Sequence, residues 1–251
     1  MPFLSIIIPA YNEARRLPHT LEQLKAFGKN FAFQWEVVLV IEKSADNTLE
    51  LAREATKNQP DFRVIDPGIQ RGKGHAVRVG MQEGRGDVLL FMDADMSVPL
   101  EEIVMFADYF AAHPQVDLLI GSRKHAGSRI LRSQNWLRQR MGECFNALLR
   151  GLTGIAIRDT QCGFKALRRE AARLIFAHQQ IDGFAFDVEV LLLAAHFGFR
   201  AEELPVRWSN SPDSRVRIVH DSLRMLRDAV VIRHRVDRLP SREAMGDPAT
   251  E

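Results

Sequence analysis

The chain has 251 residues, of which 46% are apolar and 26% charged, and its formal net charge at pH 7 is +2. This composition is typical of a globular protein and excludes a wholly disordered chain, and a charge so close to zero does not indicate a nucleic-acid-binding protein. Two cysteines, Cys144 and Cys162, exclude a disulfide scaffold and a four-cysteine zinc site, and both are expected to be reduced.

The first half of the chain alternates short apolar runs with helical patterns. Apolar runs of strand length occupy residues 5–9, 35–41, 62–65, 87–92 and 116–120. Helical spacing of apolar residues covers 14–27, 46–55, 72–84 and 99–112, with Asp46 as the expected N-cap of the second helix. Strands that alternate with helices of ~10–15 residues predict an α/β fold with a mostly parallel, Rossmann-like sheet flanked by helices.

The second half of the chain is more basic and more helical. Residues 122–150 contain seven arginines and lysines against one acid, Glu143. Helices are expected within 170–198 and over 216–236, a strand over 202–208, and a disordered tail over 239–251. The helix over 216–236 is amphipathic and arginine-rich, so its apolar face packs on the sheet or, as the alternative, lies on an anionic membrane.

No apolar run approaches the ~20 residues that a membrane-spanning helix needs. The N-terminus begins with a strand-like run and has no basic region of the kind that opens a signal peptide. The sequence therefore predicts a soluble, cytoplasmic protein.

Polar residues follow the predicted strands, at the sheet edge where α/β proteins bind their ligands. Asp93 and Asp95 come directly after the fourth strand, and two such carboxylates can share Mg²⁺ or Mn²⁺, or divide a metal and a ribose between them. Asp-X-Asp is also common in turns, but its position after a strand favours a site. Gly72 and Gly74 flank Lys73 at a helix start, where backbone N–H groups and a cation can meet a phosphate; a flexible connector with a solvated lysine is the alternative.

Two further groups of charged residues have a functional and a structural interpretation. Arginines at 123, 129, 132 and 138 could bind a phosphate through bidentate contacts, or form a solvated basic face. Asp159, Asp187 and Glu189 stand among apolar residues, and a buried carboxylate requires a partner.

These motifs, in this order, resemble family 2 glycosyltransferases of the GT-A fold. The resemblance is closest to the dolichyl-phosphate β-glucosyltransferases and other polyprenyl-phosphate glycosyltransferases. It extends over residues 4–235 and rests on SIIIPAYNEARRL, RGKGHAVRVGMQEGRGDVLLFMDADMS, GSR at 121–123, DTQCGFKAL, FDVEVLLLA and ELPVRW. The resemblance implies one GT-A domain over residues 1–238, with a nucleotide-sugar-binding half at 1–120 and an acceptor half at 121–238.

The resemblance also implies roles for matching residues. Pro9, Tyr11, Glu13 and Glu42 would line the nucleoside pocket, and Arg71 and Lys73 would approach the nucleotide and its phosphates. Asp93 and Asp95 would bind the ribose and a metal on the diphosphate. Arg123 and Arg132 would meet an acceptor phosphate, with Arg215 also on the substrate. Asp187 would be an acid near the acceptor, so that Asp95, Asp187 and Arg123 are the expected catalytic residues.

The chain departs from the family pattern in two places. The usual Asp-Asp-Gly-Ser after the second strand reads Ile41-Glu42-Lys43-Ser44, and the usual Gly-Ser-Lys reads Asp213-Ser214-Arg215. The first departure changes the charge beside the nucleoside pocket, and the second adds an acid beside the expected acceptor site.

The expected function is transfer of a hexose, with inversion, from a UDP- or GDP-sugar to a polyprenyl phosphate or other phosphate-bearing acceptor, with Mg²⁺ or Mn²⁺ as cofactor. A phosphate acceptor is already an anion, whereas a soluble alcohol or thiol would need Asp187 as a base. The alternatives are a nucleotidyltransferase and a nucleotide-sugar-binding protein of impaired activity. A lipid acceptor implies a cytoplasmic protein that is peripheral at the inner face of the membrane.

Overall fold

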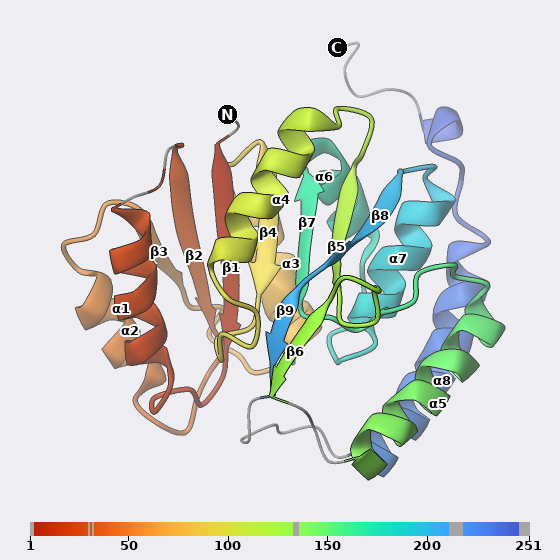
Figure 1. Cartoon of the computed structure of the whole chain (residues 1–251), viewed down its shortest axis with the longest axis horizontal. Helices are drawn as coiled ribbons and strands as arrows, with labels where there is room; N and C mark the ends of the chain where they lie inside the picture. Colours follow the sequence, from red (N-terminus) through yellow and green to blue (C-terminus); the bar gives the residue numbers. More distant parts are fainter. Residues whose placement is uncertain (1–2, 30, 32, 133–135, 211–217, 246–251) are drawn as a thin grey trace.

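The computed structural model describes residues 3–29, 31, 33–132, 136–210 and 218–245. Its centre is a seven-stranded sheet in the order β3-β2-β1-β4-β7-β5-β8 (Figure 1). The strands are β1 (Leu4–Ala10), β2 (Trp35–Ile41), β3 (Phe62–Ile65), β4 (Val88–Met92), β5 (Leu118–Ser122), β7 (Phe164–Arg168) and β8 (Ala201–Pro205). The five strands predicted in the first half are therefore confirmed, and so is a mostly parallel α/β sheet.

One strand of the large sheet was not predicted. β7 lies between β4 and β5 and runs antiparallel to both, whereas the other pairs in the sheet are parallel. Its sequence, FKALR, contains two basic residues in five, which hides it from a search for apolar runs. The insertion carries residues of the segment 159–165 to the carboxyl ends of the parallel strands.

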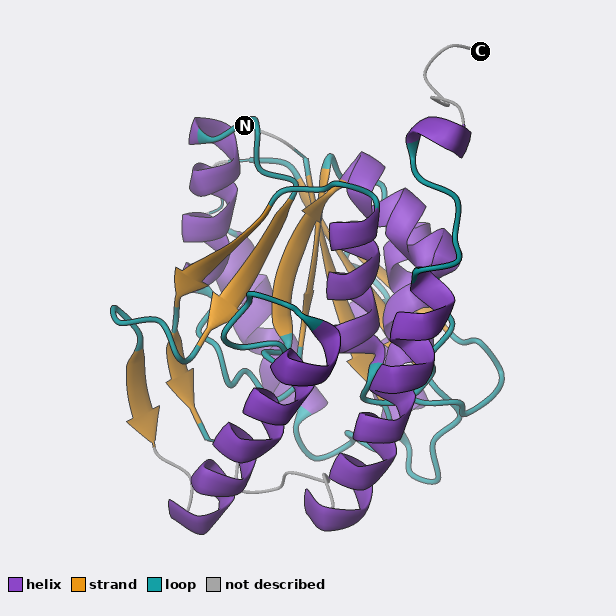
Figure 2. Cartoon of the chain, turned by 90° about the vertical axis from the view of Figure 1, so that its right-hand side faces the viewer, coloured by secondary structure: helices purple, strands orange, loops and turns teal. Residues whose placement is uncertain are grey.

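Helices cover both faces of the sheet, as Figure 2 shows. Alternate residues of each strand point to opposite faces, so Ile7 belongs to one apolar core and Ile6 and Ile8 to the other. The first core includes α3 (Lys73–Glu83), α5 (Trp136–Thr153), α6 (Arg169–His178), α7 (Phe186–His196) and α8 (Ile218–Val236). The second includes α1 (Leu17–Gly28), α2 (Thr48–Thr56) and α4 (Glu101–Ala112).

The N-cap of α2 differs from the prediction. Asn47, not Asp46, is the N-cap residue, and the helix begins at Thr48. Asp46 lies one residue earlier, and its Oδ1 accepts a hydrogen bond from Thr48 N at 3.2 Å. The aspartate therefore still satisfies a free N–H group of the first turn, from one position further out.

The strand expected over 202–208 is divided between two sheets. β8 joins the large sheet, whereas β9 (Arg207–Ser209) pairs in parallel with β6 (Arg129–Arg132). Ser209 N also donates to Ser97 O at 2.8 Å, in the segment that follows β4. The small sheet therefore lies beside the carboxyl ends of the parallel strands, as Figure 1 shows.

The apolar face of α8 packs on the body of the protein. Met225, Ala229, Ile232 and Val236 are buried in the core shared with α5 and α7. The prediction that this helix packs on the protein is therefore confirmed, but its main neighbours are α5 and α7 rather than the sheet, and Val230, which was expected on the apolar face, is 52% exposed. In the tail expected to be disordered, a 3₁₀ turn spans Glu243–Met245 and Arg242 pairs with Glu170; residues 246–251 lie outside the described residues.

Candidate active site

The predicted phosphate-binding lysine and the first metal-binding aspartate lie together. Lys73 Nζ, at the start of α3, is 2.5 Å from Asp93 Oδ1, directly after β4. Burial works to lower the pKa of Lys73, but the charges of Asp93, Asp187 and Asp95 outweigh it, so that this pKa is raised. The ammonium is therefore charged near neutral pH and is held among carboxylates.

The turn after β4 fixes the second aspartate. Asp95 Oδ1 accepts hydrogen bonds from Ser97 N at 3.0 Å and from Ser97 Oγ at 2.8 Å. Met96, between them, has a φ of 55°, in the left-handed region. This Asx-type turn fixes the orientation of the side chain of Asp95, which is two residues after Asp93 in the sequence.

The donor set suits a hard divalent cation. Among the described residues no group of three or more His, Cys, Asp or Glu side chains could hold a metal by itself. Two aspartates that share a bound cation with substrate phosphates are, however, a common arrangement for Mg²⁺. The side chain of Asp93 is 39% exposed, which leaves it accessible to a ligand. Asp93 and Asp95 therefore fit Mg²⁺ or Mn²⁺ bound together with a diphosphate.

Glu42 holds the loop that carries Lys73. This buried carboxylate accepts hydrogen bonds from Gly72 N at 2.9 Å and Arg71 N at 3.2 Å, and it contacts His75 Nδ1 at 2.8 Å. These contacts use both of its oxygens. The structure thus gives Glu42 a supporting role in the site, in addition to the nucleoside contact expected of it.

The same loop meets the segment before α7 at very close range. Gly72 has a φ of 136°, and a Cβ there would lie 2.5 Å from Asp182 O, so only glycine fits. Asp182 O accepts hydrogen bonds from Gly74 N at 2.7 Å and from His75 N at 3.3 Å. Arg71 Nε donates to Asp182 Oδ2 at 2.8 Å. Most of the N–H groups expected to meet a phosphate are therefore bonded within the protein, and the positive groups of this loop are the side chains of Arg71, paired with Asp182, and Lys73, paired with Asp93.

The residues expected to line the nucleoside pocket lie at the end of β1. Pro9 belongs to this strand, Tyr11 is 36% exposed, and Glu13 forms two hydrogen bonds of 2.6 Å with the guanidinium of Arg16. Asn12 ties this segment to the end of β2, since its N donates to Ser44 Oγ at 3.0 Å.

A hollow beside these residues contains the position where the chain departs from the family pattern. It lies at the ends of β2 and β3, and Lys43, Ser44, Glu50 and Asp66 line it. The family departure at Lys43 thus adds a cation to a hollow whose other charged lining residues are carboxylates.

The expected acceptor arginine is paired with a buried carboxylate. Arg123 donates to Asp159 Oδ2 from N at 2.9 Å and from Nε at 2.7 Å, and to Oδ1 from Nη2 at 2.8 Å. Burial alone would raise the pKa of Asp159, but the charge and hydrogen bonds of Arg123 lower it to about 2. The Arg123 guanidinium also lies 5.4 Å from the ring centroid of Trp208. Arg123 is therefore held rigidly, with 28% of its side chain exposed.

The two carboxylates of α7 have the partners that their burial requires. Asp187 forms an ion pair with Lys165, whose side chain is fully buried. Burial raises the pKa of Asp187, although the charges of Lys165 and Lys73 oppose this shift. Glu189 pairs with Arg235 and accepts hydrogen bonds from Gln180 N and Ile181 N at 3.0 and 2.8 Å. The prediction of buried, partnered acids in this segment is confirmed.

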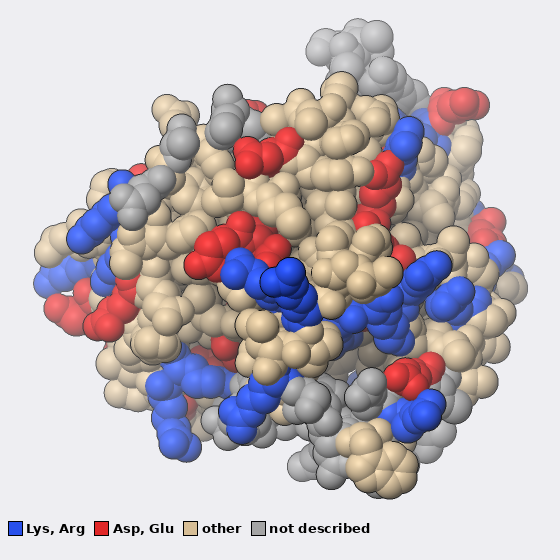
Figure 3. All heavy atoms as spheres, in the orientation of Figure 1, with Lys and Arg blue, Asp and Glu red and all other residues tan. Residues whose placement is uncertain are grey.

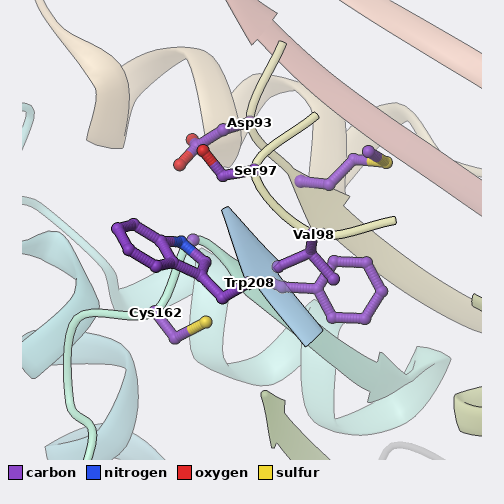
Figure 4. A pocket seen from close by; sticks show the side chains of 8 residues that line it. Asp93, Ser97, Val98, Cys162 and Trp208 are labelled. Carbon is purple, nitrogen blue, oxygen red and sulfur yellow. The ribbon is translucent and has the colours of Figure 1, made fainter. Parts of the chain in front are cut away.

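A small pocket adjoins Asp93 and brings in residues that the sequence analysis did not single out. Its lining includes Asp93, Ser97, Val98, Cys162 and Trp208, and Figure 4 shows the indole of Trp208 opposite Asp93 and Ser97. Cys162 is a free cysteine, as predicted, and burial raises its pKa to about 12, so the thiol is unreactive. The side chain of Cys144 lies outside the described residues. The position of Trp208 in the ELPVRW motif is the only sequence signal for it.

The other expected acceptor residues are on the surface or outside the described part of the chain. All four residues of β6, Arg132 among them, are exposed. Lys and Arg side chains gather over this part of the face drawn in Figure 3. Arg215 lies outside the described residues. The structure thus brings together Lys73, Asp93 and Asp95, and it leaves Arg132 apart in the small sheet.

Comparison with known proteins identifies relatives that are glycosyltransferases. A sequence profile described as "Glycosyl transferase family 2" matches residues 5–176. A dolichyl-phosphate beta-glucosyltransferase of Saccharomyces cerevisiae is 35% identical over 92% of this chain and 74% of that protein. The human protein of that name is 32% identical over 92% of this chain and 75% of its own. This chain spans 66% of a relative from Trichomonas vaginalis, which is 31% identical.

Solved structures share the fold at lower identity. A glucosyl-3-phosphoglycerate synthase of Mycobacterium tuberculosis in complex with UDP has a TM-score of 0.66 and 16% identity, and the match covers 96% of this chain and 82% of that one. A mannosyltransferase of Pyrobaculum calidifontis, in complex with GDP-Man and Mn²⁺, has a TM-score of 0.59 and 19% identity, over 97% of this chain and 67% of that one. At such identities these structures establish the fold alone.

Proposed function

The chain belongs to glycosyl transferase family 2 and has the GT-A fold, and we propose that it transfers a hexose, with inversion, from a UDP- or GDP-sugar to a polyprenyl phosphate. The observation that carries this proposal is the contact of Lys73 with Asp93 beside Asp95 at the carboxyl edge of the sheet. The relatives named dolichyl-phosphate beta-glucosyltransferase support the choice of acceptor.

In this proposal the first half of the domain over 1–238 binds the donor. Pro9, Tyr11 and Glu13 lie at the end of the strand that would hold the nucleoside, and Lys73 places a positive charge where the diphosphate would be bound. Asp93 and Asp95 would hold Mg²⁺ or Mn²⁺, which when bound offsets the charge that grows on the leaving diphosphate. The ammonium of Lys73 acts on the same charge from the protein side.

The second half would bind the acceptor and orient it. Arg123, fixed by Asp159, and Arg132 would contact the acceptor phosphate, with Arg215 also at that site. Holding a phosphate oxygen in line with the anomeric carbon supplies much of the rate, since the nucleophile is already ionised. Asp187 is engaged by Lys165, which supports a mechanism in which no protein base removes a proton from the acceptor.

A polyprenyl acceptor requires that the site reach a membrane surface. No described helix has the length and apolar character needed to cross a bilayer. Ile130 and Leu131, which lie between Arg129 and Arg132 in β6, are 46% and 61% exposed. Trp136, at the start of α5 and four residues before Arg140, is 73% exposed. Apolar side chains beside cations suit the interfacial zone of an anionic membrane, so we place the peripheral contact here rather than on α8.

Direct product analysis tests the proposal. The protein is incubated with Mn²⁺, UDP-glucose or GDP-mannose, and a short-chain polyprenyl phosphate in detergent, and the released nucleotide and the glycolipid are measured. Release of nucleoside diphosphate together with a glycosylated lipid is expected. Release of sugar 1-phosphate, with the nucleoside monophosphate transferred to the acceptor, would indicate a nucleotidyltransferase. In a parallel reaction with 3-phosphoglycerate in place of the lipid, transfer only to 3-phosphoglycerate would indicate a soluble phosphate acceptor. Binding of the nucleotide-sugar without turnover under all conditions would indicate an impaired binding protein.

A further inference from the structure

The side chain of Lys165 is a deeply buried cation behind the exposed edge of the site, and the expected site residue with which it forms an ion pair is Asp187. It belongs to β7, the antiparallel strand inserted between β4 and β5, and its side chain is 0% exposed. Its Nζ contacts Asp187 Oδ1, donates to Cys162 O at 2.8 Å, and lies 5.5 Å from the ring centroid of Phe91. A buried ammonium is tolerated only with such partners.

Four charges of alternating sign connect Lys165 with the expected metal site. Asp187 is in the first turn of α7, where its negative charge also interacts favourably with the helix dipole. The charges of Lys165 and Lys73 both act on Asp187, and the charges of Asp187 and Asp93 both act on Lys73. The series Asp93, Lys73, Asp187, Lys165 therefore runs from the carboxyl end of β4 into the interior, with zero net charge.

We propose that Lys165 is a positioning residue for sugar transfer: it occupies Asp187, so that the ammonium of Lys73 stays with Asp93 and the donor diphosphate. This inference rests on the proposed function. Without Lys165, the remaining cations that interact with Asp187 would be Lys73 and Arg123, and Arg123 is held by Asp159, so Lys73 would be drawn away from Asp93. Lys165 itself touches neither Asp93 nor the exposed part of the site, so it acts through Asp187 and Lys73.

The stability of the fold alone does not explain why a lysine is buried at position 165. A buried ion pair is weak evidence for stability, since replacing both partners by apolar residues is often neutral or stabilising. In addition, the segment that ends in Lys165 supports the site at two further points. Asp159 holds Arg123, and a Cβ at Gly163 would lie 2.2 Å from Asp93 Oδ2. Lys165 is thus part of one segment that faces three expected site residues.

The experiment compares Lys165→Met with Arg168→Met in the complete chain. Arg168 is a cation of the same strand, but its guanidinium donates only to backbone oxygens, of Val116, Phe110 and His113, all remote from the site. Both variants are assayed for sugar transfer with Mn²⁺ across a range of pH, and their melting temperatures are measured. Lys165→Met is expected to lower kcat at least tenfold, whereas Arg168→Met lowers the melting temperature and keeps kcat within about twofold.

The pH profile distinguishes positioning from simple destabilisation. The groups whose charges interact with that of Asp187 include Lys165 from β7, Lys73 from α3, Asp93 directly after β4 and Arg123 directly after β5. Loss of Lys165 removes a charge that lowers the pKa of Asp187, so Asp187 takes up a proton at higher pH in Lys165→Met. Protonated Asp187 no longer attracts Lys73, so the deficit in kcat of Lys165→Met relative to the wild type should narrow as the pH falls. The ratio of the kcat of Arg168→Met to that of the wild type should not depend on pH. Wild-type kcat in Lys165→Met, or a deficit that does not narrow at low pH, would overturn the proposal.

A second variant keeps the test decisive if Lys165→Met does not fold. The double variant Lys165→Met/Asp187→Asn leaves neither a buried unpaired charge nor a carboxylate that could draw Lys73 away from Asp93. It is therefore expected to melt near the wild-type temperature and to recover most of the kcat that Lys165→Met alone loses. A kcat that is still reduced at least tenfold in this variant would overturn the proposal. If the wild-type protein transfers no sugar, the proposed function fails instead, and the readout becomes the thermal shift produced by UDP with Mn²⁺. A smaller shift in Lys165→Met than in both Arg168→Met and the double variant would then support the positioning of Lys73, and equal shifts in all three would overturn it.

Discussion

Replacing Asp159 by asparagine should destabilise the protein in a pH-dependent way. Asp159 is 1% exposed and accepts three hydrogen bonds from Arg123, and its pKa falls from an ordinary value of 3.8 to about 2. Each pKa unit is equivalent to about 1.4 kcal/mol, so this carboxylate contributes about 2 kcal/mol to the free energy of unfolding at pH 7. A neutral asparagine amide at this position cannot provide that contribution.

The sign of the pH dependence follows from the lowered pKa. The unfolded chain takes up the proton first as the pH falls, so the contribution is nearly complete above about pH 4 and is lost as the pH falls through about 2. About half of it remains at pH 3. The difference in stability between the wild-type protein and Asp159→Asn should therefore shrink between pH 7 and pH 3.

Urea denaturation followed by circular dichroism at both pH values measures this difference. Asp237→Asn is a matched control, because Asp237 forms an exposed ion pair with Arg233 and its loss should change stability by less than about 0.5 kcal/mol. The reasoning is refuted if Asp159→Asn costs the same at pH 7 and pH 3, or no more than the control at pH 7.

Four further outcomes are expected. Asp95→Asn should reduce Mn²⁺-dependent transfer several hundred-fold without a change in melting temperature, because an amide is a poorer ligand for a hard cation; near-normal turnover would remove the metal assignment. Arg132→Ala should raise the acceptor KM roughly 10- to 100-fold and leave the donor KM unchanged, since a charge-assisted contact is worth about 1.5–3 kcal/mol; a raised donor KM would put this arginine at the nucleotide. The double variant Leu131→Ser/Trp136→Ser should weaken co-sedimentation with anionic vesicles and preserve activity on a short acceptor in detergent, whereas undiminished co-sedimentation would exclude β6 and the start of α5 as the contact. Glu42→Gln should raise the KM for the donor through a loosened Lys73 loop, measurable in the same assay, and an unchanged donor KM would show that its hydrogen bonds to this loop are dispensable.

The sequence predicted the parts of the fold that depend on local pattern. The parallel strands were found because buried strands read as continuous apolar runs, and the pair Asp93 and Asp95 was found because it follows one of them. β7 was not predicted because its second residue, Lys165, is a charged residue that is tolerated in a core only with a tertiary partner.

Contacts between segments that are distant in the sequence could not be predicted from local sequence patterns. Asp159 and Asp187 were correctly expected to need partners, but nothing local shows that these would be Arg123 and Lys165. The hydrogen bonds of Glu42 with the Lys73 loop likewise join residues about 30 positions apart. A family pattern identifies the residues of the site, whereas the role of each residue depends on its hydrogen-bond and ion-pair partners in the folded structure.

The insertion of β7 has a consequence for how the protein reaches its native state. β4 and β5 are separated in the sheet by a strand that the ribosome makes later than either, so no native hydrogen bonds join the two halves of the sheet before β7 arrives. Pairings between segments so far apart in sequence form slowly. The same strand carries Lys165, and the turn before it carries Asp159 and Gly163. A chain in which β7 has not yet paired therefore also lacks the contacts that these residues make with the charged residues of the site. We therefore expect refolding chains to bind UDP and Mn²⁺ only after this late strand is in place, so that catalytic competence reports on completion of the sheet.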